Sequence, residues 1–173
     1  MKCLWDFAAL AVVYAFLFPY LRRRGRWALR SGTALYLYLS AALYVVLMPV
    51  LASIPDIGSH PYVPMALAPF DDLICGYGGA LRQIVLSVLL TVPFGFLLPC
   101  VSQKFRFGKT VLTVFLCSVG VELLQPLLSP RRISDITDVI TNTAGGVLGW
   151  LLFLLFEKRI RSLRDTVDGC GNG

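Results

Sequence analysis

Two runs of polar residues stand inside long apolar stretches near the carboxyl end of the chain, on either side of a Ser-Pro-Arg-Arg turn. An α-helix advances about 100° per residue, so residues three or four positions apart share one face. The residues that fit this spacing are Ser118, Glu122 and Gln125 before the turn, and Asp135, Asp138 and Asn142 after it, with Arg132 beside the turn. We expect the two polar faces to lie against each other, away from lipid.

These residue types allow two interpretations. A carboxylate in hydrocarbon costs several kcal/mol unless it is paired, protonated or hydrated, so such clusters often mark functional sites. Arg132 is the expected ionic partner, and it could also hold a phosphate or carboxylate group. Paired carboxylates could perform acid–base chemistry if one were protonated and another kept ionised. The alternative is structural: a hydrogen-bonded hairpin that holds the molecule together.

Other chemistries are disfavoured by the sequence. His60 is the single histidine, so neither a Ser-His-Asp triad nor a zinc site is expected. The glycines at 76, 78 and 79 are not followed by the Gly-Lys-Ser/Thr of a phosphate loop, and we expect no cofactor and no metal. The five cysteines are scattered without a C-x-x-C motif, so no disulfide framework is indicated.

The composition predicts a membrane protein. The chain has 173 residues, of which 57% are hydrophobic. Five apolar runs are long enough to cross a bilayer, at about 4–20, 33–51, 81–101, 110–128 and 136–156. We therefore predict an all-α, polytopic helical bundle forming a single membrane domain over residues 1–173. Residues 157–173 are predicted to be a cytoplasmic tail that ends in disorder, and the proline-rich segment 52–80 to lie at the interface or fold over the mouth of the bundle.

The charges predict an orientation. The net charge of +6 is not taken as a sign of nucleic-acid binding, because the basic residues cluster at the ends of the apolar runs. Twelve of the sixteen Lys and Arg residues fall in three segments on one side of the predicted bundle, and four fall on the other side. By the positive-inside rule, the amino terminus is expected outside and the carboxyl terminus in the cytoplasm.

Small residues and prolines predict where helices approach closely. Pro93 lies within the third apolar run, where it should kink or unwind the helix, and Gly95 follows it. Gly145 and Gly149 share the helical face of Asp138. We expect Pro93, Gly95, Gly145 and Gly149 to allow close helix packing.

The order of these residues resembles the signature of VanZ-like membrane proteins. The pattern consists of Glu122-x-x-Gln125, then Arg132-x-x-Asp135-x-x-Asp138-x-x-x-Asn142-x-x-Gly145, closing at Gly149, with an upstream Pro93-Phe94-Gly95. The motifs lie between about Leu81 and Phe156, and the VanZ-like core is placed at about residues 34–156. Members of the family often carry an Asn about two turns before the Pro-x-Gly, where this chain has Ser87.

The resemblance implies a bacterial cell-envelope protein linked to reduced susceptibility to glycopeptides, notably teicoplanin. Its site would bind a lipid-linked envelope component or a lipophilic glycopeptide, with membrane lipids as partners. Two alternatives stay open: an integral membrane enzyme that modifies a lipid head group, and a small transporter. The absence of an inverted repeat disfavours the transporter.

Overall fold

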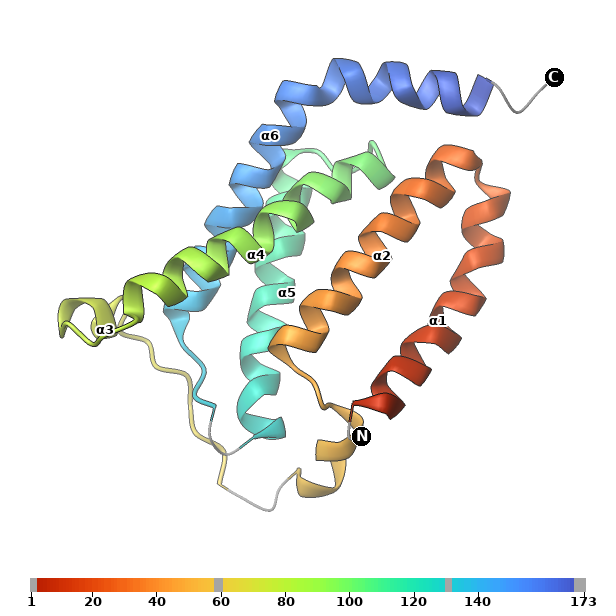
Figure 1. Ribbon diagram of the computed structural model, residues 1–173. Helices are drawn as coiled ribbons and strands as arrows, with labels where there is room; N and C mark the ends of the chain where they lie inside the picture. Colours follow the sequence, from red (N-terminus) through yellow and green to blue (C-terminus); the bar gives the residue numbers. More distant parts are fainter. Residues whose placement is uncertain (1–2, 58–60, 130–131, 170–173) are drawn as a thin grey trace.

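The computed structural model describes residues 3–57, 61–129 and 132–169, and these residues form a bundle of helices without strands (Figure 1). The five long helices are α1 (Leu4–Arg23), α2 (Arg26–Val46), α4 (Ala80–Val101), α5 (Phe107–Leu128) and α6 (Ile136–Gly169). All five are long and apolar enough to cross a membrane, which confirms the predicted all-α membrane architecture. Two short elements, η1 (Leu51–Asp56) and α3 (Asp71–Ile74), lie in the connection between α2 and α4.

Two helices extend beyond the apolar runs predicted to cross the membrane. Helix α2 begins at Arg26, seven residues before the predicted start, because arginine and alanine favour a helix as much as the apolar residues that follow. Only Arg24 and Gly25 separate it from α1, and Gly25 adopts a φ of 115° that favours glycine. Helix α6 continues to Gly169 through the predicted tail, where Arg161 pairs with Glu157 at 2.6 Å over one helical turn.

Helix α4 lies at the centre of the bundle, between α6 on one side and α2 on the other (Figure 1). It remains one helix through Pro93 and Pro99, so the unwinding expected at Pro93 does not occur. The apolar core is formed by Phe94 and Leu98 of α4 with Val114 of α5. Tyr38 of α2 covers this core, with its ring stacked 6.4 Å from that of Phe94.

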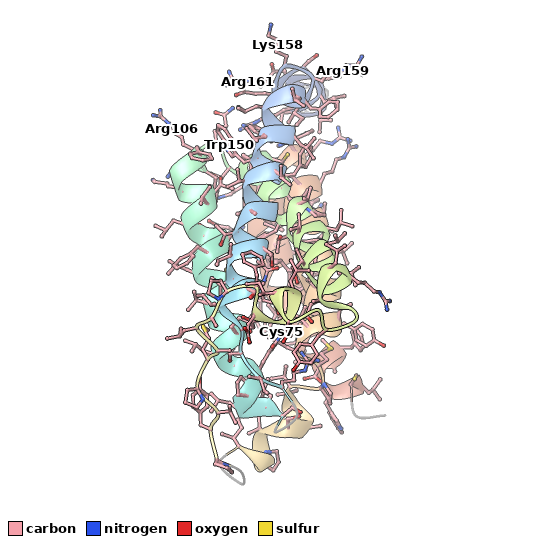
Figure 2. All side chains as sticks on the ribbon, turned by 90° about the vertical axis from the view of Figure 1, so that its left-hand side faces the viewer. Cys75, Arg106, Trp150, Lys158, Arg159 and Arg161 are labelled. Atoms are coloured by element: carbon pink, nitrogen blue, oxygen red, sulfur yellow. The ribbon has the colours of Figure 1, made fainter. Side chains whose placement is uncertain are left out.

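Helix α1 begins, and helix α6 finishes, at opposite ends of the bundle (Figure 1). The last part of α6 runs across the bundle beside the turn between α1 and α2. There the Asp168 carboxylate accepts a hydrogen bond of 3.0 Å from the backbone N–H of Trp27, in the first turn of α2. Arg106, Lys158, Arg159 and Arg161 gather at this same end, and Cys75 lies well away from it (Figure 2).

The connection between α2 and α4 passes beside the segment that leads into α6. The backbone of Ala66 donates to the carbonyl of Ser134 at 2.9 Å and accepts from Ile136 at 3.0 Å. Segment 61–70 therefore lies beside the start of α6.

Candidate functional site

Two of the predicted polar residues, Glu122 and Asp135, meet at the start of α6. The N–H groups that begin a helix have no partner within it and need acceptors from elsewhere. Asp135 supplies one through Oδ1, which accepts from the N–H of Thr137 at 2.8 Å. Its own N–H donates to Oε2 of Glu122 at 3.1 Å, and the Ser134 hydroxyl donates to the Glu122 carbonyl. Glu122, which is 2% exposed, therefore joins α5 to the start of α6.

Asp138 faces α4 rather than α5. Its Oδ1 accepts from the Ser87 hydroxyl at 2.9 Å, and its Oδ2 accepts from the side-chain amide of Gln83 at 3.2 Å. Neither donor was among the predicted site residues. The sequence did contain a signal for them. Gln83, Ser87 and Thr91 are spaced four residues apart, which predicts a polar face on α4.

Asn142 lies two turns into α6 and contacts α5. Its amide nitrogen donates to the Ser118 hydroxyl at 2.9 Å, which joins the two predicted polar faces at this depth. Its carbonyl oxygen is buried and has no hydrogen-bond partner. A buried acceptor of this kind normally pairs with a donor, from the protein, from water or from a ligand.

Arg132 does not make the predicted ion pair. Within the described part of the chain, the only ion pairs are Arg161–Glu157 and Arg164–Asp168, both far along α6. The guanidinium of Arg132 instead donates to the carbonyl of Val46, at the end of α2. The carboxylates take their hydrogen bonds from neutral donors, which explains how they are accommodated without the arginine.

Gln125 lies on the same side as Arg132. Together with residues from the end of α2 and the segment that follows it, they line a cavity of about 220 Å³. The six predicted site residues are thus divided: Glu122 and Asp135 cap α6, Asp138 contacts α4, Asn142 contacts α5, and Gln125 and Arg132 face the end of α2.

Segment 66–72 covers the carboxylates at the start of α6. The N–H of Phe70 donates to the Thr137 hydroxyl at 2.9 Å, and Phe70 adopts a φ of 60°, which is uncommon for a residue other than glycine. Asp135 and Asp138 line a narrow cavity of about 20 Å³ beneath this segment, which leaves little space beside them.

The glycines bring the backbones of α4 and α6 together below the polar residues. A Cβ on Gly149 would lie 2.8 Å from the backbone nitrogen of Phe96 and would overlap the carbonyl of Val92. A Cβ on Gly145 would overlap the Thr91 hydroxyl, and one on Gly95 would lie 2.8 Å from the carbonyl carbon of Gly146. This crossing fixes the position of Asp138 against α4.

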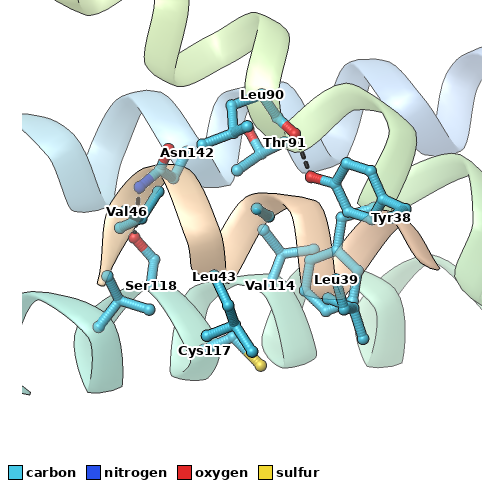
Figure 3. A pocket seen from close by; sticks show the side chains of 13 residues that line it. Tyr38, Leu39, Leu43, Val46, Leu90, Thr91, Val114, Cys117, Ser118 and Asn142 are labelled. Carbon is cyan, nitrogen blue, oxygen red and sulfur yellow. Dashed lines mark hydrogen bonds between the residues drawn. The ribbon is translucent and has the colours of Figure 1, made fainter. Parts of the chain in front are cut away.

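A third cavity, which is apolar and holds about 120 Å³, lies between α2 and α5 (Figure 3). Leu39, Leu43 and Val46 from α2 face Val114 and Cys117 from α5, and Asn142 and Ser118 form its polar edge. The described residues contain no cluster of three or more His, Cys, Asp or Glu side chains that could hold a metal ion. His60 and Arg131 lie outside the described residues.

Comparison with known proteins identifies the family. The sequence matches the VanZ/LLP1 family over residues 7–157, further toward the amino terminus than the predicted core of 34–156. It is 31% identical over 130 residues to Protein VanZ of Enterococcus faecium, an alignment that covers 75% of this chain and 77% of that protein. No solved structure matches. With five membrane-spanning helices and this match over most of its length, the chain belongs to the VanZ-like family of multi-pass membrane proteins.

Proposed function

We propose that this protein lowers the susceptibility of a bacterial cell to teicoplanin by binding a lipid-linked envelope component, or the lipophilic glycopeptide itself, at its intramembrane polar site. The observation that carries this proposal is the group of Glu122, Asp135, Asp138 and Asn142, which joins three helices in a protein related to Protein VanZ over three quarters of the chain. Polar groups at this density inside an apolar bundle are costly to bury and are a mark of function in membrane proteins.

We also propose that the amino terminus lies outside the cell and the carboxyl terminus in the cytoplasm. Basic residues gather at the end of the bundle where the chain terminates (Figure 2), as the positive-inside rule requires of a cytoplasmic face. The start of α6, Arg132 and the cavity around Gln125 then open on the extracytoplasmic side, where a glycopeptide meets the envelope.

The proposal is tested by expression in a teicoplanin-susceptible host. The protein should raise the minimum inhibitory concentration, and Asp138→Asn should return it toward that of the empty vector. Asparagine keeps the size of the side chain and removes the charge. Its amide oxygen can accept from one of the two partners, and its NH2 group can donate to the other if the Ser87 hydroxyl rotates or the Gln83 amide turns over to accept. Asp165→Asn is the matched control, because Asp165 is exposed near the end of α6.

Protein level and melting temperature separate loss of function from loss of protein. Asp138→Asn should accumulate in membranes and melt as the wild type does. Full protection by Asp138→Asn combined with Glu122→Gln and Arg132→Gln would contradict a charged site and leave a hydrogen-bonded hairpin.

A further inference from the structure

The apolar cavity and the cavity at Arg132 follow one another along the facing sides of α2 and α5. Val46 lines both of them. On α5 the lining residues continue along one helical face, with Val114, Ser118 and Val121 in the apolar part and Gln125 and Leu128 in the polar part. We call this the α2–α5 cleft.

The cleft exists because α2 and α5 pack mainly on other helices. Helix α2 packs on α4, and α5 packs on α6, which leaves the facing sides of α2 and α5 less closely packed against each other. Tyr38, which donates to the carbonyl of Leu90, lies at the inner end of the cleft (Figure 3). The α5 side from Val114 to Leu128 is roughly 21 Å long at about 1.5 Å per residue, somewhat longer than one leaflet of a hydrocarbon core about 30 Å thick.

The two parts of the cleft differ in polarity. The inner part holds about 120 Å³ and is lined mostly by leucine, valine and aromatic carbon. An apolar cavity of about 150 Å³ stays free of water and accepts small hydrocarbons. The outer part holds about 220 Å³ and has Arg132, Gln125 and Ser53 among its lining residues.

Arg132 gives the outer part its charge. Among the side chains that the structure describes, which do not include that of Asp56, no carboxylate forms an ion pair with it, and its hydrogen bond goes to a neutral carbonyl. A guanidinium carries five N–H donors in a planar fork that matches the oxygens of a phosphate. A positive group at the outer end and an apolar cavity at the inner end are complementary to a molecule with an anionic head and a hydrocarbon chain.

We propose that the α2–α5 cleft binds a lipid phosphate, with the phosphate held by Arg132 and one hydrocarbon chain in the apolar cavity. This inference rests on the proposed function for its role in the cell, and it names the class of ligand and the side of the polar hairpin on which it binds. Phospholipids of the bilayer and polyprenyl phosphates share this chemistry, and the experiment distinguishes them.

The test measures lipid binding to the purified full-length chain in neutral detergent by native mass spectrometry. The probes are phosphatidylglycerol, undecaprenyl phosphate and a diacylglycerol with the same chains as the phosphatidylglycerol. Both phosphates should bind more tightly than the diacylglycerol. Whichever of the two binds more tightly shows whether the ligand is a bilayer phospholipid or a polyprenyl phosphate. Equal binding of phosphatidylglycerol and diacylglycerol would overturn the role of the phosphate.

Two variants with matched controls locate the site. Ala42→Trp fills the apolar part of the cleft, and Ala41→Trp places the same side chain on the exposed face of α2. Arg132→Gln removes the charge of the outer part, and Arg82→Gln removes an equal charge from the exposed start of α4. Arg132→Gln should weaken binding of the phosphates by roughly tenfold or more, as loss of a charge-assisted contact does. Ala42→Trp should weaken it by a similar factor, because the indole occupies the space of the hydrocarbon chain.

Folding and function are checked separately. If Ala42→Trp does not melt as the wild type does, Val121→Phe fills the same cavity from α5. Binding that both cleft variants retain would overturn the inference, whatever the susceptibility of the cells. Binding that both cleft variants lose while cells keep full teicoplanin protection would support the inference and contradict its link to the proposed function.

Discussion

Single residues at the start of α6 explain how three carboxylates are held in an apolar bundle. Asp135 accepts a hydrogen bond from the first turn of its own helix, Glu122 accepts one from the backbone of Asp135, and Asp138 accepts two from α4. Each of these hydrogen bonds comes from a neutral donor. Because ionised acceptors strengthen hydrogen bonds, these contacts offset part of the cost of removing the carboxylates from water.

Ser87 is the residue for which this arrangement makes the sharpest prediction. Ser87→Ala removes the hydroxyl that donates to Oδ1 of Asp138, so this oxygen no longer has a donor. Leaving an acceptor unpaired in this way lowers the free energy of unfolding by about 1–3 kcal/mol. We expect a lower melting temperature in detergent, followed by circular dichroism. Ser87→Asn keeps an N–H donor at this position and should melt close to the wild type.

The control for this prediction is Ser102, the residue that follows α4. Its hydroxyl accepts a hydrogen bond of 3.4 Å from the exposed backbone N–H of Lys104, so Ser102→Ala should have little effect. Equal melting temperatures for Ser87→Ala and the wild type would show that the hydrogen bond to Asp138 contributes nothing to stability.

The sequence predicted part of this site, for a physical reason. Glu122, Asp135 and Asn142 lie on neighbouring helices joined by a short turn, so helical spacing was enough to bring their faces together. The rotation of α4 about its own axis is set by packing between distant parts of the chain, and spacing alone did not give the contacts of Gln83 and Ser87 with Asp138. The side chain of Arg132 is oriented by its hydrogen bond to Val46 at the end of α2, 86 residues away, and local spacing does not predict this contact either.

Among the elements, the crossing of α4 and α6 determines the geometry of the site. Without side chains at Gly95, Gly145 and Gly149, the two backbones approach to van der Waals contact. In a membrane, packing of this kind is a main source of helix association, because lipid is as apolar as the side chains that it replaces. The crossing in turn holds Ser87 opposite Asp138.

Gly149→Ala tests the crossing with a single methyl group. The new Cβ would overlap the backbone of α4, so we expect a loss of about 1–3 kcal/mol, typical of overpacking, measured by thermal unfolding in detergent. Gly120→Ala in α5 is the control, since a Cβ there meets no atom within 4 Å. Alanine is the better helix former, so Gly120→Ala should leave stability unchanged or increase it. Similar losses in both variants would rule out a specific effect of the crossing.

The predicted elements differ from the observed ones mainly at their ends. Apolar length identified all five spans, because nothing but a helix can cross lipid as a single segment of this kind. The ends of the spans are not the ends of the helices. Residues 26–32 and 157–169 are polar enough to leave the membrane, yet they keep good helix formers, so both helices continue beyond the apolar run.

At the scale of the whole molecule, the orientation in the membrane determines which partners the site meets. Cys75 is exposed on the segment that precedes α4, and Ser162 is exposed near the end of α6. In a background without other cysteines, Cys75 should react with an impermeant maleimide on spheroplasts, and a cysteine introduced by Ser162→Cys should react only after the cells are broken. The reverse pattern would place the polar site on the cytoplasmic side.

A second prediction concerns the rate at which the maleimide labels Cys75, and it does not depend on the orientation of the protein in the membrane. The carboxylate of Asp71, 3.7 Å from the thiol, raises the pKa of Cys75 above its usual value. The thiolate is the form that reacts with a maleimide. Asp71→Asn should therefore speed the labelling of Cys75 at a pH below that pKa, and unchanged rates would show that the carboxylate does not act on the thiol.

The contact between Asp168 and the first turn of α2 has a consequence for the order in which the protein is made. Translation proceeds from the amino terminus, so α1 and α2 are complete long before residue 168 leaves the ribosome. The hydrogen bond from the backbone N–H of Trp27 to the Asp168 carboxylate therefore forms only after almost the whole chain has been synthesised. During that interval the start of α2 lacks this contact, although the Trp27 indole N–H can donate to the carbonyl of Cys100 once α4 has been made. The end of α6 then joins the last part of the protein to one of the first.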